Sequence, residues 1–305
     1  MKFGLFADLH YDVIPDADRR IDDLVIAFRK NKVDFVMELG DFCLSASNTV
    51  ILNKMRSINI PIYYTIGNHN TDYQPLVNVI DYFGMKNSFY SFVRDSIKFI
   101  VLDTNYIKID NQFIPFEIKN YYKTNGDYPY IPDFEIEWLT KELDDDYPCV
   151  ICTHHSLTND VGHNGVVNRQ EIRRIIEKKS QEFDNKILIC LNGHDHGSRI
   201  TLVNNIVYYG INSCAYFWQE YGEHHCFSDK IHEEYPMLKN MILYKEALYS
   251  IVEIDKDLNI VITGMEGKYL NITPEEIGMP NLLEGVSILP RTISLTKQQG
   301  IVTIY

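Results

Sequence analysis

The sequence has few cysteines and few basic residues, and both shortages narrow its possible functions. The six cysteines show no regular spacing, so neither a disulfide framework nor a thiolate zinc site is predicted. Lysine and arginine number 29 against 42 acidic residues, which gives a formal net charge of −13. This balance argues against broad binding to nucleic acid or to anionic membranes. Any phosphate group that the protein handles must therefore be held locally.

Long hydrophobic runs are also missing. No apolar run approaches the roughly 18 residues of a membrane span. The N-terminal segment reaches an acid at Asp8, which is too early for a signal peptide. We therefore expect a cytoplasmic protein that is not attached to a membrane, and its oligomeric state stays open. The 305 residues are 45% hydrophobic, which is ample for one large core.

Buried-strand patterns alternate with helical patterns in the first part of the chain. Residues 2–7, 33–39 and 61–66 are short apolar runs typical of strands covered on both faces, whereas 18–30 and 48–57 have helical periodicity. This βαβαβ order predicts mostly parallel strands.

The later segments continue the alternation and then turn to hairpins. We expect an antiparallel pair at 88–95 and 97–103, a loop at 104–132, a helix at 133–143, strands at 148–153 and 186–191, and hairpins at 199–210 and 247–265. Asn168 and Glu171 predict a capping box at the start of a further helix. We expect residues 1–265 to form the catalytic domain and 266–305 a C-terminal extension of uncertain structure.

Five short polar islands each follow a predicted buried strand. They are Asp8-Leu9-His10, Gly40-Asp41, Gly67-Asn68-His69, His154-His155 and Gly193-His194-Asp195-His196, and they hold six of the ten histidines. We expect these side chains to converge at one edge of a sheet. Oxygen and imidazole ligands without thiolate suit manganese, iron or zinc. Two such ions a few ångströms apart are suited to attack on phosphorus.

The spacing inside the islands predicts which side chains share a face. Asp8 and His10 are two residues apart at a strand end, so one ion can take both. The same spacing recurs in Gly-His-x-His. Adjacent side chains diverge, so one histidine of the pair His154-His155 can bind metal while the other faces substrate. Asp41 can bridge two ions with one oxygen to each.

The ordered motifs, over residues 1 to about 265, resemble those of the calcineurin-like metallophosphoesterases, a group that includes small bacterial-type phosphodiesterases. The resemblance implies an α/β fold, a four-layer αββα sandwich of two mixed β-sheets. It also implies two divalent or trivalent metal ions, one bound by Asp8, His10, Asp41 and His196 and the other by Asp41, Asn68, His154 and His194. Hydrolysis would proceed by attack of a hydroxide that bridges the ions, with Asp41 and His69 as catalytic residues.

One position departs from the family pattern. The family places Asp or Glu after Gly-Asn-His, where the carboxylate orients the histidine, but position 70 is Asn. An amide supports an imidazolium poorly, and Asp72 is a possible replacement. We list His155, His163 and Asn70 as candidate substrate contacts.

The motif loops favour a small phosphoester substrate with one negative charge. They lack the arginine of the protein phosphatases, and Leu44 stands where the purple acid phosphatases have a tyrosine ligand. A diester needs no arginine clamp, so cyclic nucleotides, glycerophosphodiesters and nucleotide conjugates are the favoured substrates. The alternatives are a phosphomonoesterase, or a non-catalytic protein that binds a ligand or partner on the same fold, for which Asn70 is the only hint.

Overall fold

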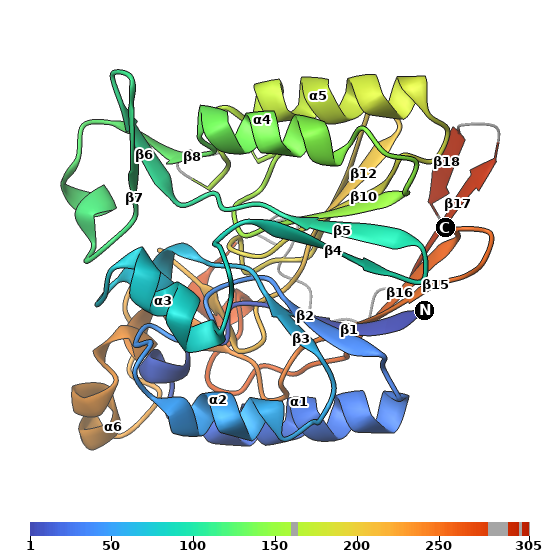
Figure 1. Ribbon diagram of the computed structural model, residues 1–305. Helices are drawn as coiled ribbons and strands as arrows, with labels where there is room; N and C mark the ends of the chain where they lie inside the picture. The colour runs from blue at the N-terminus through green and yellow to red at the C-terminus, as the bar shows by residue number, and fades with distance from the viewer. Residues whose placement is uncertain (160–163, 280–291, 299–300, 305) are drawn as a thin grey trace.

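The computed structural model describes residues 1–159, 164–279, 292–298 and 301–304. Two β-sheets pack face to face, and helices cover both outer faces (Figure 1). The predicted αββα sandwich of two mixed sheets is confirmed.

The first sheet has the strand order β18-β17-β16-β15-β1-β2-β3. Its strands are β1 (Lys2–Phe6), β2 (Phe35–Glu38), β3 (Ile62–Tyr64), β15 (Ser250–Ile254), β16 (Ile260–Gly264), β17 (Thr292–Gln298) and β18 (Ile301–Ile304). β1, β2 and β3 are parallel, as the βαβαβ pattern predicts, and the remaining pairs are antiparallel. Helices α1 (Ala17–Asn31) and α2 (Thr49–Arg56) cover the outer face, at the bottom of Figure 1.

The second sheet has the order β11-β12-β10-β9-β5-β4. Its strands are β4 (Tyr90–Arg94), β5 (Ile97–Val101), β9 (Cys149–Thr153), β10 (Ile187–Asn192), β11 (Arg199–Val203) and β12 (Ile206–Gly210). The central strands β5, β9, β10 and β12 are parallel, and the hairpins β4–β5 and β11–β12 are antiparallel as predicted. Helices α4 (Asp133–Glu142) and α5 (Arg169–Glu182) cover its outer face, at the top of Figure 1.

Three apolar layers hold the sandwich together. Between the sheets, the rings of Phe3 and Phe35 stack with centroids 5.0 Å apart, and Phe99 of the second sheet meets Phe3 edge-on at 5.4 Å. All three are fully buried, and each such side chain contributes about 1.5–3 kcal/mol to folding. Apolar faces of α1 and α5, which include Phe28 and Ile172, form the two outer layers.

The segment 104–132, predicted as a loop, instead forms a small three-stranded sheet. It contains β6 (Tyr106–Ile109), β7 (Gln112–Pro115) and β8 (Asp127–Tyr130) in the order β7-β6-β8, with the short helix η3 (Asn120–Lys123) before β8. β6 and β7 pair antiparallel around a tight turn. This appended sheet stands at the upper left of Figure 1.

Further short elements surround the sandwich. They are η1 (Tyr11–Val13), η2 (Asn68–Thr71), α3 (Leu76–Phe83), β13 (Tyr216–Trp218), α6 (Asp229–Glu234), η4 (Pro236–Asn240), β14 (Met241–Leu243) and η5 (Glu275–Ile277). No helix in the described part of the chain combines the length and the apolar composition that a membrane crossing requires.

The capping box predicted at α5 is not formed. The Asn168 side chain instead accepts a hydrogen bond from the Ile131 N–H at 3.1 Å and donates to the Ile131 carbonyl at 2.9 Å. A tertiary contact with the segment before α4 has replaced the local cap. By contrast, Asn48 caps α2 by accepting from the Val50 N–H at 3.1 Å.

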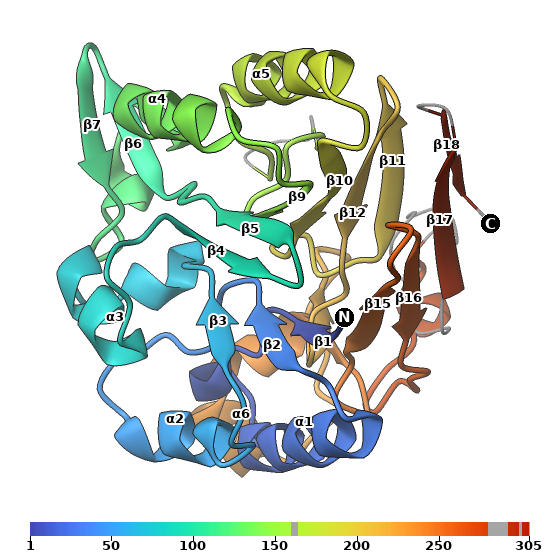
Figure 2. The same ribbon diagram turned by 45° about the vertical axis from the view of Figure 1, so that its right-hand side comes forward.

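The described part of the C-terminal segment continues the first sheet. β17 pairs antiparallel with β16 and extends the sheet at its far edge (Figure 2). Ile293 and Leu295 of β17 are buried in the layer between the sheets. A domain boundary near residue 265 remains a prediction.

Candidate metal centre

The polar islands follow the C-terminal ends of strands in both sheets. Backbone hydrogen bonds join the first two islands: the Asp8 N–H donates to the Gly40 carbonyl and the His10 N–H to the Asp41 carbonyl, both at 2.9 Å. The His194 N–H, from the second sheet, donates to Asp8 Oδ2 at 3.0 Å. Islands separated by more than 180 residues therefore meet at one place.

Four of the predicted ligands form a first cluster. His10 Nε2 lies 3.2 Å from His196 Nε2, 3.8 Å from Asp8 Oδ1 and 3.7 Å from Asp41 Oδ2. His196 Nε2 lies 3.5 Å from Asp8 Oδ1. All four residues are buried.

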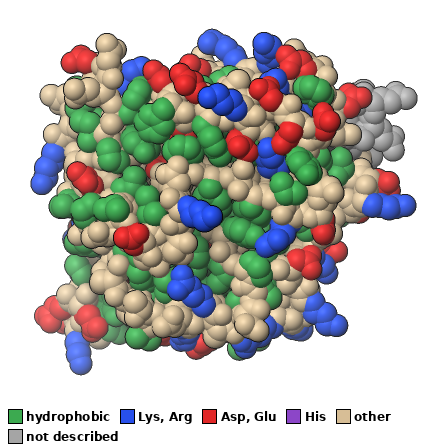
Figure 3. Space-filling view, in the orientation of Figure 1, with side chains coloured by type: hydrophobic (Ala, Val, Ile, Leu, Met, Phe, Trp, Pro, Cys, Tyr) green, Lys and Arg blue, Asp and Glu red, His purple; other side chains and the backbone are tan. Residues whose placement is uncertain are grey.

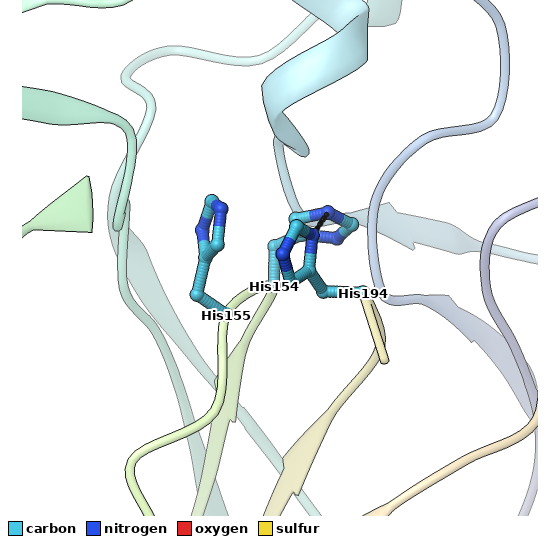
Figure 4. Close-up of side chains that lie close together, drawn as sticks. All are labelled: His154, His155 and His194. Carbon is cyan, nitrogen blue, oxygen red and sulfur yellow. Dashed lines mark hydrogen bonds between the residues drawn. The ribbon is translucent and has the colours of Figure 1, made fainter. Parts of the chain in front are cut away.

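A second cluster surrounds His154. Its Nε2 lies 3.1 Å from Asp41 Oδ2, 3.1 Å from Asn68 Oδ1 and 3.2 Å from His194 Nδ1. Figure 4 shows His154 and His155 at the end of β9 and His194 at the end of β10, with a dashed line joining His154 and His194. Asp41 belongs to both clusters.

The hydrogen bonds of the histidines aim lone pairs at the centre of each cluster. His154 Nδ1–H donates to the Leu39 carbonyl at 2.8 Å, and His196 Nδ1–H donates to the Tyr216 carbonyl at 3.0 Å. In the neutral imidazoles, the Nε2 atoms are then the unprotonated nitrogens that can bind a cation. Asp41 Oδ2 is buried and accepts no hydrogen bond from the part of the chain that the structure describes. These oxygen and nitrogen donors fit manganese, iron or zinc.

Sequence comparison agrees with this geometry. A family model described as "Calcineurin-like phosphoesterase" matches residues 1–198. The chain belongs to the calcineurin-like phosphoesterase family. It is a metal-dependent phosphoester hydrolase. No curated protein matches its sequence.

Solved structures share the fold of this phosphoesterase at low sequence identity. A dimetal phosphatase from Danio rerio is 14% identical with a TM-score of 0.57, and the match covers 90% of this chain and 99% of that one. A purple acid phosphatase, PPD1, from yellow lupin (Lupinus luteus) is 12% identical with a TM-score of 0.54, covering 89% and 52%. GAP50 of Plasmodium is 12% identical with a TM-score of 0.53, covering 90% and 89%. These similarities establish the fold alone.

The charges in the phosphoesterase centre favour ionised carboxylates. Burial opposes ionisation of Asp8, but His196 and His10 outweigh it and hold the pKa of Asp8 well below its usual value. Burial likewise opposes ionisation of Asp41, and His154 and His69 lower its pKa. Two buried carboxylates that remain charged are ready to bind cations.

The backbone at these ligands is unusual. Asp8, His10, Asp41, His194 and His196 have φ values of 54°, 49°, 60°, 67° and 53°. Residues other than glycine rarely adopt this left-handed conformation, which costs of order 1–3 kcal/mol and persists only where the surrounding structure fixes it. The surrounding structure therefore holds the ligand backbone in this conformation.

Gly67 is required by the close approach of the bridging carboxylate. A β-carbon at this position would stand 2.2 Å from Asp41 Oδ1. The same oxygen accepts a hydrogen bond from the His69 N–H at 2.8 Å. The glycine thus lets the third island reach the second.

The carboxylate that orients His69 comes from Asp72. His69 Nδ1 donates to Asp72 Oδ2 at 2.8 Å, and the Tyr121 hydroxyl donates to Asp72 Oδ1 at 2.7 Å. Burial lowers the pKa of His69, but Asp41 and the hydrogen bond to Asp72 outweigh it, so the pKa lies above its ordinary value. The ring of His69 lies 5.2 Å from that of His10, beside the first cluster.

Asn70, listed above as a candidate substrate contact, is instead bonded to the protein. Its Oδ1 accepts from the Gly67 N–H at 2.8 Å and the Asp41 N–H at 3.1 Å, and its Nδ2 donates to the Cys43 carbonyl at 2.7 Å. The side chain is buried. Asn70 therefore fixes the loops that carry Asp41 and Asn68, and a contact between Asn70 and substrate stays a prediction.

Of the other two candidate substrate contacts, His155 and His163, the structure describes only His155. His155 is buried, its Nδ1 lies 2.7 Å from Thr104 Oγ1, and its ring centroid is 4.1 Å from that of His194. A role for it toward substrate stays a prediction. His163 lies outside the described residues.

Sequence reasoning offered Asp72 as a possible partner of His69 but missed two supporting residues, Thr104 and Tyr121. Thr104 follows β5 in the run Asp103-Thr104-Asn105, and Asn105 Nδ2 donates to the Ile66 carbonyl at 2.7 Å, directly before the Gly67 loop. Polar residues after a buried strand were the signal that identified the other islands, and the same signal was present here. Tyr121 came from a segment predicted as a loop and gave no such signal.

Proposed function

We propose that this phosphoesterase hydrolyses phosphodiesters with a pair of metal ions, manganese, iron or zinc. One ion would be held by Asp8, His10, Asp41 and His196, and the other by Asp41, Asn68, His154 and His194. The position of Asp41 carries the proposal. Its Oδ2 lies 3.7 Å from His10 Nε2 and 3.1 Å from His154 Nε2. One carboxylate oxygen between two sets of ligands is the arrangement that a bridged pair requires.

The protein residues have distinct roles in this proposal. When bound, two such ions supply Lewis acidity toward the phosphoryl oxygens and lower the pKa of water. Asp8 and Asp41 offset only part of the ionic charge, and Asn68 is neutral, so positive charge remains to attract an anionic ester. His69 donates a hydrogen bond from Nδ1–H to Asp72, so in its protonated form the Nε2–H is left to donate to an oxygen of the substrate.

The lack of basic residues in the islands supports a diester. None of the five islands contains arginine or lysine, so the ions would have to balance the phosphate charge. A diester carries one negative charge where a monoester carries up to two. On the face drawn in Figure 3, basic side chains are scattered among acidic and apolar ones.

Metal content and substrate preference test the proposal together. The chelator-treated protein should not cleave bis-p-nitrophenyl phosphate, and manganese, iron or zinc should restore cleavage with two ions bound per chain. Cleavage of the diester should exceed that of p-nitrophenyl phosphate. Asp41→Asn should bind fewer than two ions and lose about a thousandfold in kcat. The matched control is His225→Ala, a histidine outside the islands.

Two results would overturn the proposal. One is a native protein that binds a single ion at saturation. The other is a metal-loaded protein that prefers the monoester, which would make it a phosphomonoesterase.

A further inference from the structure

Three side chains beside His69 form a surface that the metal centre does not use. They are Tyr73, which follows Asp72 directly, and Lys119 and Tyr122, which lie in the appended segment between β7 and β8. Lys119 Nζ stands 4.6 Å from the centroid of the Tyr73 ring. The ring of Tyr122 lies beside that of Tyr121, with centroids 4.4 Å apart and planes tilted by 37°. We call these three residues the Tyr73–Lys119–Tyr122 surface.

Asp72 connects this surface to the metal centre. Lys119 Nζ lies 3.7 Å from Asp72 Oδ2, the oxygen that accepts the hydrogen bond from His69. The Ile118 N–H donates to the Thr71 carbonyl at 2.8 Å, so the appended segment is fixed against the loop that carries His69. The surface is therefore held directly beside the imidazole that faces the substrate.

The link continues through Tyr121 to a metal ligand. Asn68 Nδ2 donates to the Tyr121 hydroxyl at 3.4 Å, and Tyr121 donates to Asp72. Partial burial, and after it the charges of Asp72 and Asp41, raise the pKa of Tyr122.

The rings of Tyr73 and Tyr122 are exposed, whereas most aromatic side chains of the described chain are not. Tyr73 is 60% exposed and Tyr122 61%, although each sits next to a buried neighbour. Lys119 is 39% exposed, and its ammonium, which has three donors, lies 3.7 Å from the Asp72 carboxylate. Exposed aromatic rings around a cation, beside a catalytic centre, are suited to binding a flat group and an anion together.

We propose that the Tyr73–Lys119–Tyr122 surface binds a nucleoside diphosphate portion of the substrate. This inference rests on the proposed function, of which it names the substrate class. The tyrosine rings offer faces on which a base can stack. Lys119 offers a point charge to the phosphate that is not cleaved. A glycerophosphodiester would leave both rings without a partner.

Binding of products tests the inference without turnover. Titration calorimetry on the metal-loaded protein would compare ADP, AMP and ribose 5-phosphate. The double variant Tyr73→Leu/Tyr122→Leu should bind ADP and AMP about tenfold more weakly and ribose 5-phosphate within twofold of the native protein. Lys119→Met should weaken ADP more than AMP. The controls are Tyr147→Leu, at a ring 41% exposed, and Lys178→Met, at a lysine 74% exposed.

A second measurement separates recognition from damage to the centre. The double variant should cleave methyl p-nitrophenyl phosphate at the native rate, because this ester has no group that reaches the surface. Lys119→Met removes a charge 3.7 Å from Asp72 Oδ2, so it is judged only by its binding of ADP against AMP. Native protein that binds ADP no better than ribose 5-phosphate overturns the inference, as does a double variant that weakens both ligands equally. If the protein shows either of these binding results but still cleaves diesters, the inference about the Tyr73–Lys119–Tyr122 surface is wrong and the proposed function stands. Selective ADP binding by a protein without diesterase activity would refute only the proposed function.

Discussion

The bond between Asp72 and His69 should matter most for substrates with poor leaving groups. In the native protein, His69 Nδ1 lies 2.8 Å from Asp72 Oδ2. The substitution Asp72→Asn keeps an acceptor for this hydrogen bond but removes the negative charge that favours the imidazolium form of His69. His69 should then protonate a departing alkoxide less readily. A nitrophenolate leaves without a proton, so its release should be little affected.

The size of the effect follows from the charges. Two unit charges about 4 Å apart at an effective dielectric constant of 20 interact by roughly 4 kcal/mol. The His69 side chain is 26% exposed, and Lys119 Nζ lies 3.7 Å from the same carboxylate oxygen. We therefore discount the loss to about 1.5–3 kcal/mol, which is roughly 10- to 100-fold in kcat.

The assay compares two diesters on the same metal-loaded variants. Asp72→Asn should lose roughly 10- to 100-fold in kcat on a diester with an alkyl leaving group and less than about threefold on bis-p-nitrophenyl phosphate. Asp81→Asn, an exposed aspartate on α3, is the control and should change neither. Equal losses on both diesters would show that Asp72 only supports the loop, and the reasoning about His69 would be wrong.

Three further predictions address the metal site and stability. Gly67→Ala should abolish binding of the second metal ion in a metal titration, because the new methyl would stand 2.2 Å from Asp41 Oδ1, whereas Gly210→Ala, with its nearest contact at 3.4 Å, should bind normally. Burial alone would raise the pKa of Asp145, but Lys98 and Lys186 outweigh burial and lower that pKa in the folded protein. The ionised carboxylate therefore stabilises the fold at pH values above the pKa of about 4 that Asp145 has in the unfolded chain, and this stabilisation is lost as the pH falls. In urea unfolding Asp145→Asn should cost about 0.5–1 kcal/mol at pH 7 and almost nothing at pH 2, and an equal cost at both would contradict the assignment. Manganese at about 100 times its Kd should stabilise the folded protein by about 2.7 kcal/mol in thermal unfolding, and no shift would argue against a preformed site.

The fold could be predicted where the periodicity was strong. The parallel strands around Phe3 and Phe35 and the hairpin at Asn204-Asn205 lie where the pattern placed them, because continuous apolar runs and tight-turn residues are unambiguous local signals. The small sheet β6–β8 was missed. Pro115 and Pro129 lie within its two edge strands, β7 and β8, where a sheet tolerates proline.

The residues of the candidate site could be predicted from the sequence, but their hydrogen-bond partners could not. The sequence identified His69 and the anomaly at Asn70, and it offered Asp72 as one possible replacement. It could not show that Asn70 bonds to the backbone of Gly67 and Asp41, because that contact depends on how two loops meet. The prediction that Asn168 caps α5 was wrong for the same reason, because its side chain bonds to Ile131, which lies 37 residues away in the chain.

The left-handed backbone at the five ligand residues limits how the centre can change. Aspartate and histidine are among the few side chains that this conformation accepts readily, and they are also the residues that the proposed ions require. Glutamate at position 8 or 41 would keep a carboxylate, yet it would lose the match between side chain and backbone. A redesign of the centre for another metal therefore has to use residues that adopt a positive φ at these positions. Asparagine, aspartate, histidine and glycine are the residues that do so most readily.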